Sequence, residues 1–256
     1  GVERKAIWLG QLATRHPAYA SLRALAQSLA SATGASLGVL AEGANAAGAH
    51  LAGVLPHRSA GGAAAPSTGL NARQMLEKSL QGYVLLGVEP GADSLQAGAL
   101  SAVGGASFVV ALTPYASEEL KSVAHVLLPV GSFAETSGTY VNLEGEWQSF
   151  PGAAQPLGES RPAWKVLRVL GNLLGLSGFE QNSSEDVRGE LRSAVDSAQP
   201  AAAVVAAVAS VPADARVVDV PIYRVDALVR RAASLQATRD GGQVTAEYGA
   251  AQGVAR

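Results

Sequence analysis

The chain contains no cysteine. Disulfides, thiolate zinc sites, cysteine-held iron–sulfur clusters and cysteine nucleophiles are therefore excluded within it. Charge is also scarce: 16% of the residues are charged and the formal net charge is −2. Such a balance gives no reason to expect nucleic acid or an anionic membrane as a partner.

Long hydrophobic runs are missing as well. The longest apolar run, 201–209, lies between two prolines and is far too short to cross a bilayer. The start of the chain is charged and carries no secretory signal pattern. Met75 is the only methionine. We therefore expect no direct membrane insertion, and we interpret the chain as a fragment of a longer polypeptide.

What the sequence does contain is an alternation of short apolar segments with segments of helical period. Hydrophobic residues make up 48% of the chain, as in globular proteins. The alternation predicts parallel sheets, and the uninterrupted apolar strands predict a sheet covered on both faces. The predicted strands are 6–10, 37–40, 83–87, 108–112 and 125–129, and the predicted helices between them are 16–34, 72–79, 94–103 and 117–123.

These elements predict a division of the chain into consecutive parts. Residues 1–55 form the end of a first α/β unit, 56–68 a linker rich in small residues, and 69–150 a second α/β unit. Residues 151–256 form a helical extension and tail. Within this last part we expect helices over 164–174, from Ser183 to about 198 and from Asp226, whereas 240–256 shows no coherent period.

The segment 87–91 is the first candidate site, because it follows a strand and precedes a helix. Backbone amides at such a place form a cradle for phosphate. An ordinary strand-to-helix turn explains the same residues, and the acidic Glu89 disfavours a phosphate. The four histidines lack metal-ligand spacing; His125 is interpreted as a hydrogen-bonded core residue, and His57 as a possible polar contact to a ligand or subunit.

The segment 124–148 is the second candidate. Pro129 stops an apolar strand, and a glycine-punctuated extended run leads to a Glu-Gly turn. Such a string indicates backbone laid closely against another group. Glu135 and Glu144 stand in positions that favour the holding of loop amides over catalysis. No nucleophile–base pair and no metal cluster is evident, so we predict no catalytic residue and no metal ligand.

These two segments together resemble the molybdopterin oxidoreductase family. Residues 87–90 are similar to its Gly-x-Asn-Pro cofactor loop, and 128–148 carry its Leu-Pro, Glu, Gly-Thr, Asn, Glu-Gly and Gln in order. The resemblance implies two Rossmann-like parallel-sheet units of the formate dehydrogenase-like fold, followed by helical segments. It makes vestigial cofactor-binding candidates of Gly87, Glu89, Pro90, Gly138, Thr139, Asn142 and Gly145.

Within the family, 134–176 most resembles the large iron–sulfur subunit of bacterial NADH:quinone oxidoreductase (complex I). Further likeness lies in 40–45, 220–223 and 226–231. The resemblance implies a structural scaffold with no cofactor of its own, iron–sulfur clusters in a missing N-terminal part, and a missing C-terminal domain. It also implies other peripheral-arm subunits of complex I as partners, at the cytoplasmic side of the bacterial inner membrane.

Two departures from the family pattern support an abandoned cofactor site. Glu89 stands where cofactor-binding relatives usually have Asn, and Glu146 where many have Arg after the Glu-Gly turn. An ionised carboxylate can only accept hydrogen bonds. Two alternatives stay open: the cofactor-binding part of an active molybdopterin-dependent oxidoreductase, with 87–91 and 138–142 around the cofactor, and an α/β module that holds a nucleotide at 87–91.

Overall fold

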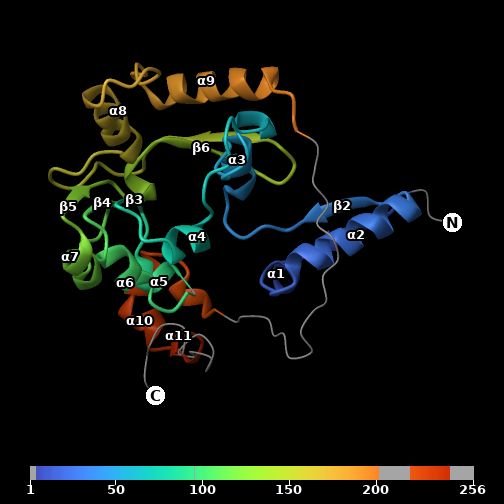
Figure 1. Ribbon diagram of the computed structural model, residues 1–256, viewed down its shortest axis with the longest axis horizontal. Helices are drawn as coiled ribbons and strands as arrows, with labels where there is room; N and C mark the ends of the chain where they lie inside the picture. The colour runs from blue at the N-terminus through green and yellow to red at the C-terminus, as the bar shows by residue number, and fades with distance from the viewer. Residues whose placement is uncertain (1–3, 95, 202–219, 243–256) are drawn as a thin grey trace. The chain divides into compact units, whose positions relative to one another are not determined.

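The computed structural model describes residues 4–94, 96–201 and 220–242 (Figure 1). Its contacts separate two compact units. The first comprises 1–47, 141–145 and 201–248, and the second 48–140, 146–200 and 249–256. The predicted boundaries between consecutive parts of the chain stay a prediction.

The first unit begins with a strand–helix–strand element. Strands β1 (Ala6–Leu9) and β2 (Ser36–Val39) pair in parallel, joined by α1 (Gln11–Thr14) and α2 (Tyr19–Thr33). Helix α2 ends at Gly34, whose φ of 69° favours glycine. The predicted helix start at His16 is wrong. A residue before proline avoids helical angles, and the imidazole Nδ1 of His16 instead accepts the Ala18 N–H at 3.0 Å.

The described residues 220–242, also in the first unit, form single helical turns. These are η3 (Ile222–Arg224), η4 (Val229–Arg231), α10 (Ala233–Gln236) and α11 (Arg239–Gly242). The Oδ1 atom of Asp226 accepts the Leu228 and Val229 N–H groups, each at 2.9 Å, but the residue at the N-cap of η4 is Leu228. The helix expected from Asp226 is only the 3₁₀ turn η4. Nearly all of the 201–209 run, and the tail from 243, lie outside the described residues.

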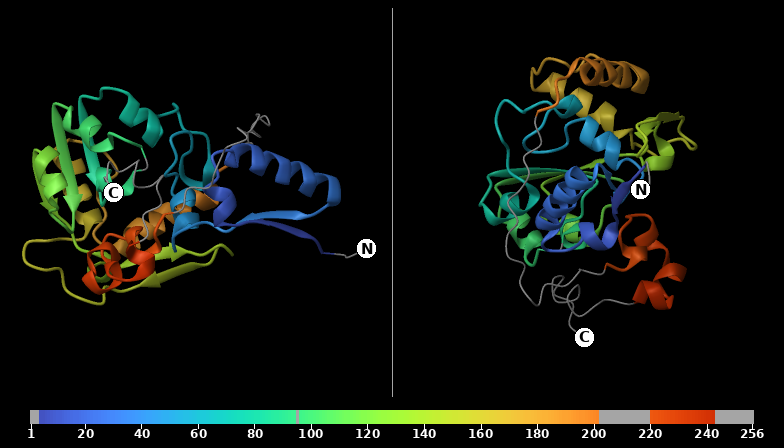
Figure 2. Two further views of the ribbon diagram at one scale, coloured as in Figure 1. Left: turned by 90° about the horizontal axis from the view of Figure 1, so that it is seen from below. Right: turned by 90° about the vertical axis from the view of Figure 1, so that its right-hand side faces the viewer.

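The second unit contains a three-stranded parallel sheet (Figure 2). Strands β3 (Gly82–Leu86), β4 (Phe108–Thr113) and β5 (Val126–Pro129) lie in that order. They alternate with α4 (Ala72–Glu77), α5 (Pro90–Asp93), α6 (Ala99–Gly104) and α7 (Glu118–Val123). The helix predicted over 94–103 is displaced, because Pro90 starts α5 early and Gly98, at φ 80°, directly precedes α6.

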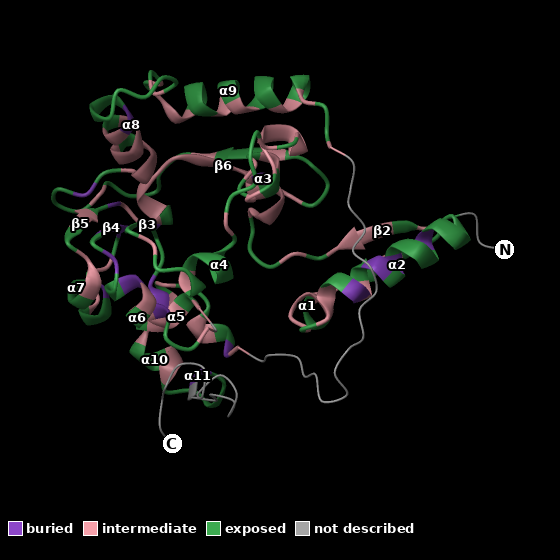
Figure 3. Cartoon of the chain, in the orientation of Figure 1, coloured by how far each residue is buried: buried purple, intermediate pink, exposed green. Residues whose placement is uncertain are grey.

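The main core cluster of this unit packs on the face of the sheet that carries Tyr83 and Leu85. Figure 3 colours the buried residues of the chain purple. Tyr83 and Leu85 of β3 are buried there with residues of β4, α6 and α7. On the opposite face, Val84 is 61% exposed and Phe108 51% exposed, whereas Leu112 is fully buried. The prediction of a sheet covered on both faces is therefore wrong at Val84 and Phe108. Helices α6 and α7, one from each crossover, contribute to the same core cluster. Apolar composition alone does not reveal which side of the sheet a helix takes.

The remaining elements include a strand pair and two longer helices. Strands β6 (Gly138–Val141) and β7 (Trp147–Phe150) pair across a connection too short for a parallel crossover, so they form a hairpin. Helices α8 (Ala163–Leu173) and α9 (Ser184–Ser197) confirm both predictions, and Ser183 caps α9 with Asp186 in a capping box. The short elements are α3 (Ala46–Leu51), η1 (Ala60–Gly62) and η2 (Phe133–Glu135).

The predicted fold class is confirmed: parallel sheets alternate with helices, and helical segments follow. None of the described helices is long and apolar enough to span a membrane.

Candidate functional site

The loop after β3 occupies the place where parallel sheets bind ligands. Gly87 has a φ of 63°, and its N–H donates to the Leu112 carbonyl at 2.9 Å. Glu89 caps α5 and is only 7% exposed. Its N–H donates to the carboxylate of Asp93 at 2.8 Å. Two amides of the predicted cradle are therefore already bonded within the chain.

The electrostatics of this loop oppose an anion. A Cβ atom on Gly91 would lie 2.5 Å from Glu119 Oε2, so α7 brings a third acid beside Glu89 and Asp93. A phosphate about 4 Å from one carboxylate is repelled by about 1 kcal/mol in water and by about 4 kcal/mol near a protein surface. Carboxylates at these positions disfavour a phosphate-bearing group, such as the pyrophosphate of a nucleotide or the phosphate of a pterin.

The second candidate segment is packed against its own chain. A Cβ on Gly138 would lie 2.8 Å from Phe150 Cζ, so the glycine lets the β7 ring approach β6. The hydroxyl oxygens of Thr139 and Ser149 lie 2.9 Å apart across the hairpin. Close backbone approach, which the sequence predicted here, is thus present. At Gly138 the backbone lies against the ring of Phe150, which belongs to the same hairpin.

The turn after β6 is closed locally. Asn142 Oδ1 accepts the Glu144 N–H at 2.9 Å, and the Gly145 N–H donates to the Asn142 carbonyl at 3.0 Å. Gly145 adopts a φ of 87°, which explains the glycine. The carboxylate of Glu144 makes no hydrogen bond or ion pair with a residue in the described ranges. The prediction that this carboxylate holds loop amides is therefore wrong; only its backbone takes part.

Asn45, from the early stretch that resembles the family, contacts the end of β6. Its side-chain Oδ1 accepts the Val141 N–H at 2.9 Å. Both residues belong to the first unit. The bond joins two segments far apart in sequence, and it satisfies an amide at the edge of the hairpin.

Glu135 holds loop amides, as the sequence predicted. Its Oε2 accepts the Ser132 N–H at 2.7 Å, and its Oε1 accepts the Leu157 N–H at 3.2 Å. Hydrogen bonds from the backbone and the hydroxyl of Ser132, and then from Leu157, lower the pKa of this carboxyl below its ordinary value. A carboxylate held ionised in this way is suited to fixing two loops and unsuited to general acid catalysis.

The histidines do not form a site. His125 Nδ1 accepts the Val109 N–H at 3.1 Å, and its ring centroid lies 5.7 Å from that of Phe108. It is hydrogen-bonded as predicted but exposed, so its assignment to the core is wrong. Across the part of the chain that the structure describes, no three His, Asp or Glu side chains are placed to hold a metal ion.

The predicted cofactor candidates fall into two separate groups. Gly87, Glu89 and Pro90 lie at the end of β3. Gly138 and Thr139 lie in β6, and Asn142 and Gly145 lie in the turn after it. No hydrogen bond joins the groups among the described residues. Sequence reasoning missed Asp93 and Glu119 as partners of the loop. The one available signal was the carboxylate at position 93, one helical turn beyond Glu89.

Comparison with known proteins decides the ancestry of these segments. Residues 3–173 match the family model described as molybdopterin oxidoreductase. The chain belongs to this family. The family predicted from the two motifs is therefore confirmed.

Curated members of the molybdopterin oxidoreductase family and related chains match over short stretches. The assimilatory nitrate reductase catalytic subunit of Bacillus subtilis is 33% identical over 136 residues, 50% of this chain and 19% of that protein. The mitochondrial NADH-ubiquinone oxidoreductase 78 kDa subunit of Candida albicans is 45% identical over 53 residues, which make up 21% of this chain and 7% of that protein. A putative formate dehydrogenase of Staphylococcus aureus is 39% identical over 62 residues, which make up 24% of this chain and 6% of that protein. The matched part thus spans less than a fifth of each relative.

Proposed function

We propose that this chain is a structural scaffold within an oxidoreductase of the molybdopterin family, and that the parent is the cluster-bearing subunit of NADH:quinone oxidoreductase. The observation that carries the proposal is the bond between the Glu89 N–H and Asp93, at 2.8 Å. Where a cofactor loop would present a free amide to a ligand, this chain supplies its own carboxylate. The buried Glu89 and the nearby Glu119 support the same conclusion.

The proposed scaffold works through fixed backbone. Glu135 ties the loop before η2 to the loop that leads into α8, and Gly138 lets Phe150 close the β6–β7 hairpin. Electron transfer from NADH toward quinone would use iron–sulfur clusters carried elsewhere in the parent, because this chain has no cysteine to hold one. Its residues would keep neighbouring polypeptide in place.

The choice of parent rests on two likenesses. The segment 134–176 carries the complex I pattern, and the Candida albicans subunit is 45% identical over its matched stretch. With that parent, the partners are other peripheral-arm subunits of complex I, and the location is the cytoplasmic side of the bacterial inner membrane.

A second candidate is the cofactor-binding part of an active molybdopterin-dependent oxidoreductase. The similarity to the Bacillus subtilis nitrate reductase favours it, because this match covers 50% of the chain against 21% for the complex I relative. In such an enzyme the loop 87–91 and the segment 138–142 would border the cofactor. The acidic loop weighs against this candidate, and equally against a nucleotide held at 87–91.

The chemical content of the purified chain separates these functions. We expect no stoichiometric molybdenum by elemental analysis, no pterin fluorescence after oxidation and no visible absorbance. Stoichiometric molybdenum or pterin would overturn the scaffold proposal, and a nucleotide released on denaturation would favour the nucleotide-binding module. An affinity-tagged chain should also retain complex I subunits from detergent-solubilised membranes; retention of nitrate reductase partners instead would contradict the choice of parent.

A further inference from the structure

A cavity flanks α8 in the second unit. Its volume of about 560 Å³ falls in the range of small-molecule sites. One wall is Leu128 of β5, and α8 supplies most of the rest. Among the lining residues are Trp164, Lys165, Arg168, Leu170 and Leu173. Among the described residues, no acidic side chain lines it.

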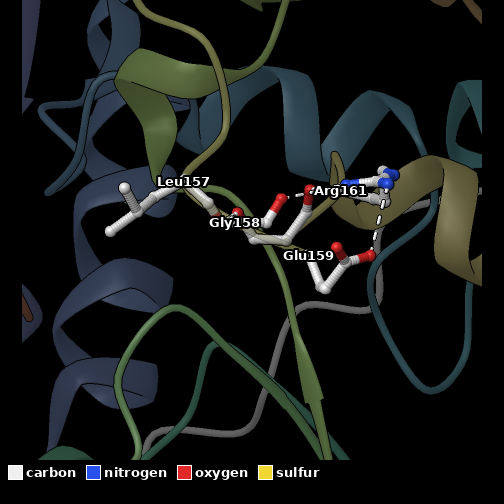
Figure 4. A network of polar contacts seen from close by, with 5 residues as sticks. Leu157, Gly158, Glu159 and Arg161 are labelled. Atoms are coloured by element: carbon white, nitrogen blue, oxygen red, sulfur yellow. Dashed lines mark hydrogen bonds and ion pairs between the residues drawn. The ribbon is translucent and has the colours of Figure 1, made fainter.

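Arg161 fixes the edge of this cavity. Its carbonyl accepts the Gly131 N–H at 2.9 Å, which joins the entry of α8 to the end of β5. Its guanidinium turns back onto the preceding loop, donating to the Ser160 carbonyl at 2.8 Å and lying 3.6 Å from the Glu159 carboxylate (Figure 4). The Arg161 charge is therefore already partly neutralised.

Lys165 and Arg168 carry charge that is not neutralised. They lie one turn apart on α8, and neither forms an ion pair with any residue that the structure describes. Lys165 Nζ lies 5.4 Å from the centroid of the Trp164 ring, a cation–π distance. A second cavity, of about 390 Å³, shares Trp164 and Arg168 and includes Glu190 in its lining, but this carboxylate accepts a hydrogen bond from Gln181.

Two of the residues that line the cavity also carry buried hydrogen-bond donors without acceptors in the described ranges, which adds to the excess of positive charge. The Nε–H of Arg168 and the indole N–H of Trp164 are buried and find no acceptor in the described part of the chain. A buried donor without an acceptor destabilises the folded chain, and more so when the group is charged. A negative charge in the cavity would offset the electrostatic part of this cost.

The other walls are apolar and partly open. Leu173 is 80% exposed, and Val169 is also exposed at the rim. Together with Leu128 and Leu170 they form an apolar surface next to two uncompensated cations. A ligand that satisfies both features combines an apolar body with an anionic group.

We propose that this cavity binds a small amphiphilic anion, an acyl chain or ring system that carries one carboxylate or phosphate. The anionic group lies against Lys165 and Arg168, and the apolar body lies against Leu128, Leu170 and Leu173. The site shares no residue with the loop after β3. It goes beyond the proposed scaffold function and does not rest on it.

Decanoate, used as a monomer, is the probe that tests this site. Binding to the 256-residue chain is followed by calorimetry and by tryptophan fluorescence, to which Trp164 contributes. Decyl phosphate tests the phosphate form of the head. Decanol and decyltrimethylammonium supply the same chain with neutral and positive heads, and acetate supplies the charge without the chain. We expect saturable binding of the two anionic chains, and binding at least tenfold weaker for the other three.

Matched variants locate the binding. In the double variant Lys165→Gln/Arg168→Gln we expect the Kd for decanoate to rise at least tenfold, about 1.4 kcal/mol, because both charges that face the anionic head are removed. Arg73→Gln on α4 removes a charge outside the cavity and should leave the Kd within about twofold. Leu173→Ser changes a largely exposed residue, so the fold should persist while the Kd rises.

Three results would overturn the proposal. They are equal binding of decanoate and decanol, an unchanged Kd in the double variant whose circular dichroism matches that of the parent chain, and binding of an acidic-apolar peptide where decanoate does not bind. The last would assign the surface to a polypeptide. None of these results bears on molybdenum or pterin content, so failure here is distinguishable from failure of the scaffold proposal.

Discussion

The loop after β3 and the cavity beside α8 belong to the same compact unit and have opposite character. The loop carries the family pattern, yet its Glu89 amide is bonded to Asp93 and acids surround it. The cavity carries no recognised cofactor motif, yet Lys165 and Arg168 have no counter-charge among the described residues. A motif therefore records descent, whereas the capacity to bind a ligand depends on polar and charged groups that the chain leaves without partners.

The largest effect is expected at Gly138, where the family motif meets Phe150. In Gly138→Val, the added carbons collide with the Phe150 ring, because even a Cβ would lie 2.8 Å from Cζ. We expect a loss of about 2–3 kcal/mol in the free energy of unfolding, measured in urea. Gly189→Ala on α9 is the control: a Cβ there meets nothing within 4 Å, and the change should stabilise by about 0.5–1 kcal/mol.

A second substitution shows whether Phe150 is the reason for this glycine. Adding Phe150→Leu to Gly138→Val should recover part of the lost stability, because the smaller side chain makes room for valine. If recovery is absent, Gly138 is conformationally required or faces another group. Contact with Phe150 would then not explain the glycine, and this part of the family motif would no longer contrast with the cavity beside α8.

A smaller effect is expected at Asp93, which acts in the loop as an internal ligand. Asp93→Ala leaves the Glu89 N–H without its acceptor and should destabilise the chain by about 1–2 kcal/mol in urea unfolding. Asp93→Asn keeps an acceptor oxygen and should lose less than half of that. Equal stability of Asp93→Ala and the parent chain would mean that this carboxylate is dispensable to the loop.

The carboxylate of Glu135 makes the stability of the folded chain depend on pH. Hydrogen bonds lower its pKa in the folded state below the ordinary 4.5, so the unfolded chain binds the proton more tightly. This part of the stability is present above pH 4.5 and is lost as the pH falls through the lowered folded-state value.

Glu135→Gln should remove that contribution. Urea unfolding at a series of acidic pH values should show the difference between parent and variant shrinking as the pH falls below 4.5. Glu185 and Asp186 also have lowered pKa values, so the parent and the variant both keep some pH dependence, and the difference between them isolates Glu135. A difference that stays constant with pH would contradict this role.

The smallest effect is expected at the cavity. Arg168→Met replaces a partly buried, uncompensated cation by an apolar chain of similar length. We expect unchanged stability or a gain of up to about 1 kcal/mol in thermal unfolding, because an unpaired charge is removed. A loss of more than about 1 kcal/mol would show that Arg168 stabilises the fold, and the contrast with the self-satisfied loop would disappear.

The sequence predicted the strands well, because apolar runs bounded by glycine and proline are local signals. All five predicted parallel-sheet strands are present in the structure, as β1 to β5. Helices α8 and α9 could also be predicted, α8 from its amphipathic period and α9 from its capping pattern. The family motifs correctly gave the ancestry of the chain.

The failures share a physical cause. The uncovered face of β3 depends on which side the crossover helices take, and the exposed position of His125 depends on packing between distant segments. The Asp93 bond depends on where α5 begins, which Pro90 decides. The cavity along α8 could not be predicted either, since an unpaired cation is recognisable only when its surroundings are known.

In the proposed scaffold, the chain's own groups occupy the former cofactor loop, and a titration followed by amide nuclear magnetic resonance shows whether this loop still binds an anion. The ¹⁵N-labelled chain is titrated with pyrophosphate, which carries the charge of a nucleotide-type cofactor without its rings. The Gly87 and Glu89 amides donate to Leu112 and Asp93, so we predict no saturable shift at residues 87–91. Saturable shifts at these amides would show a working anion site and contradict the scaffold function.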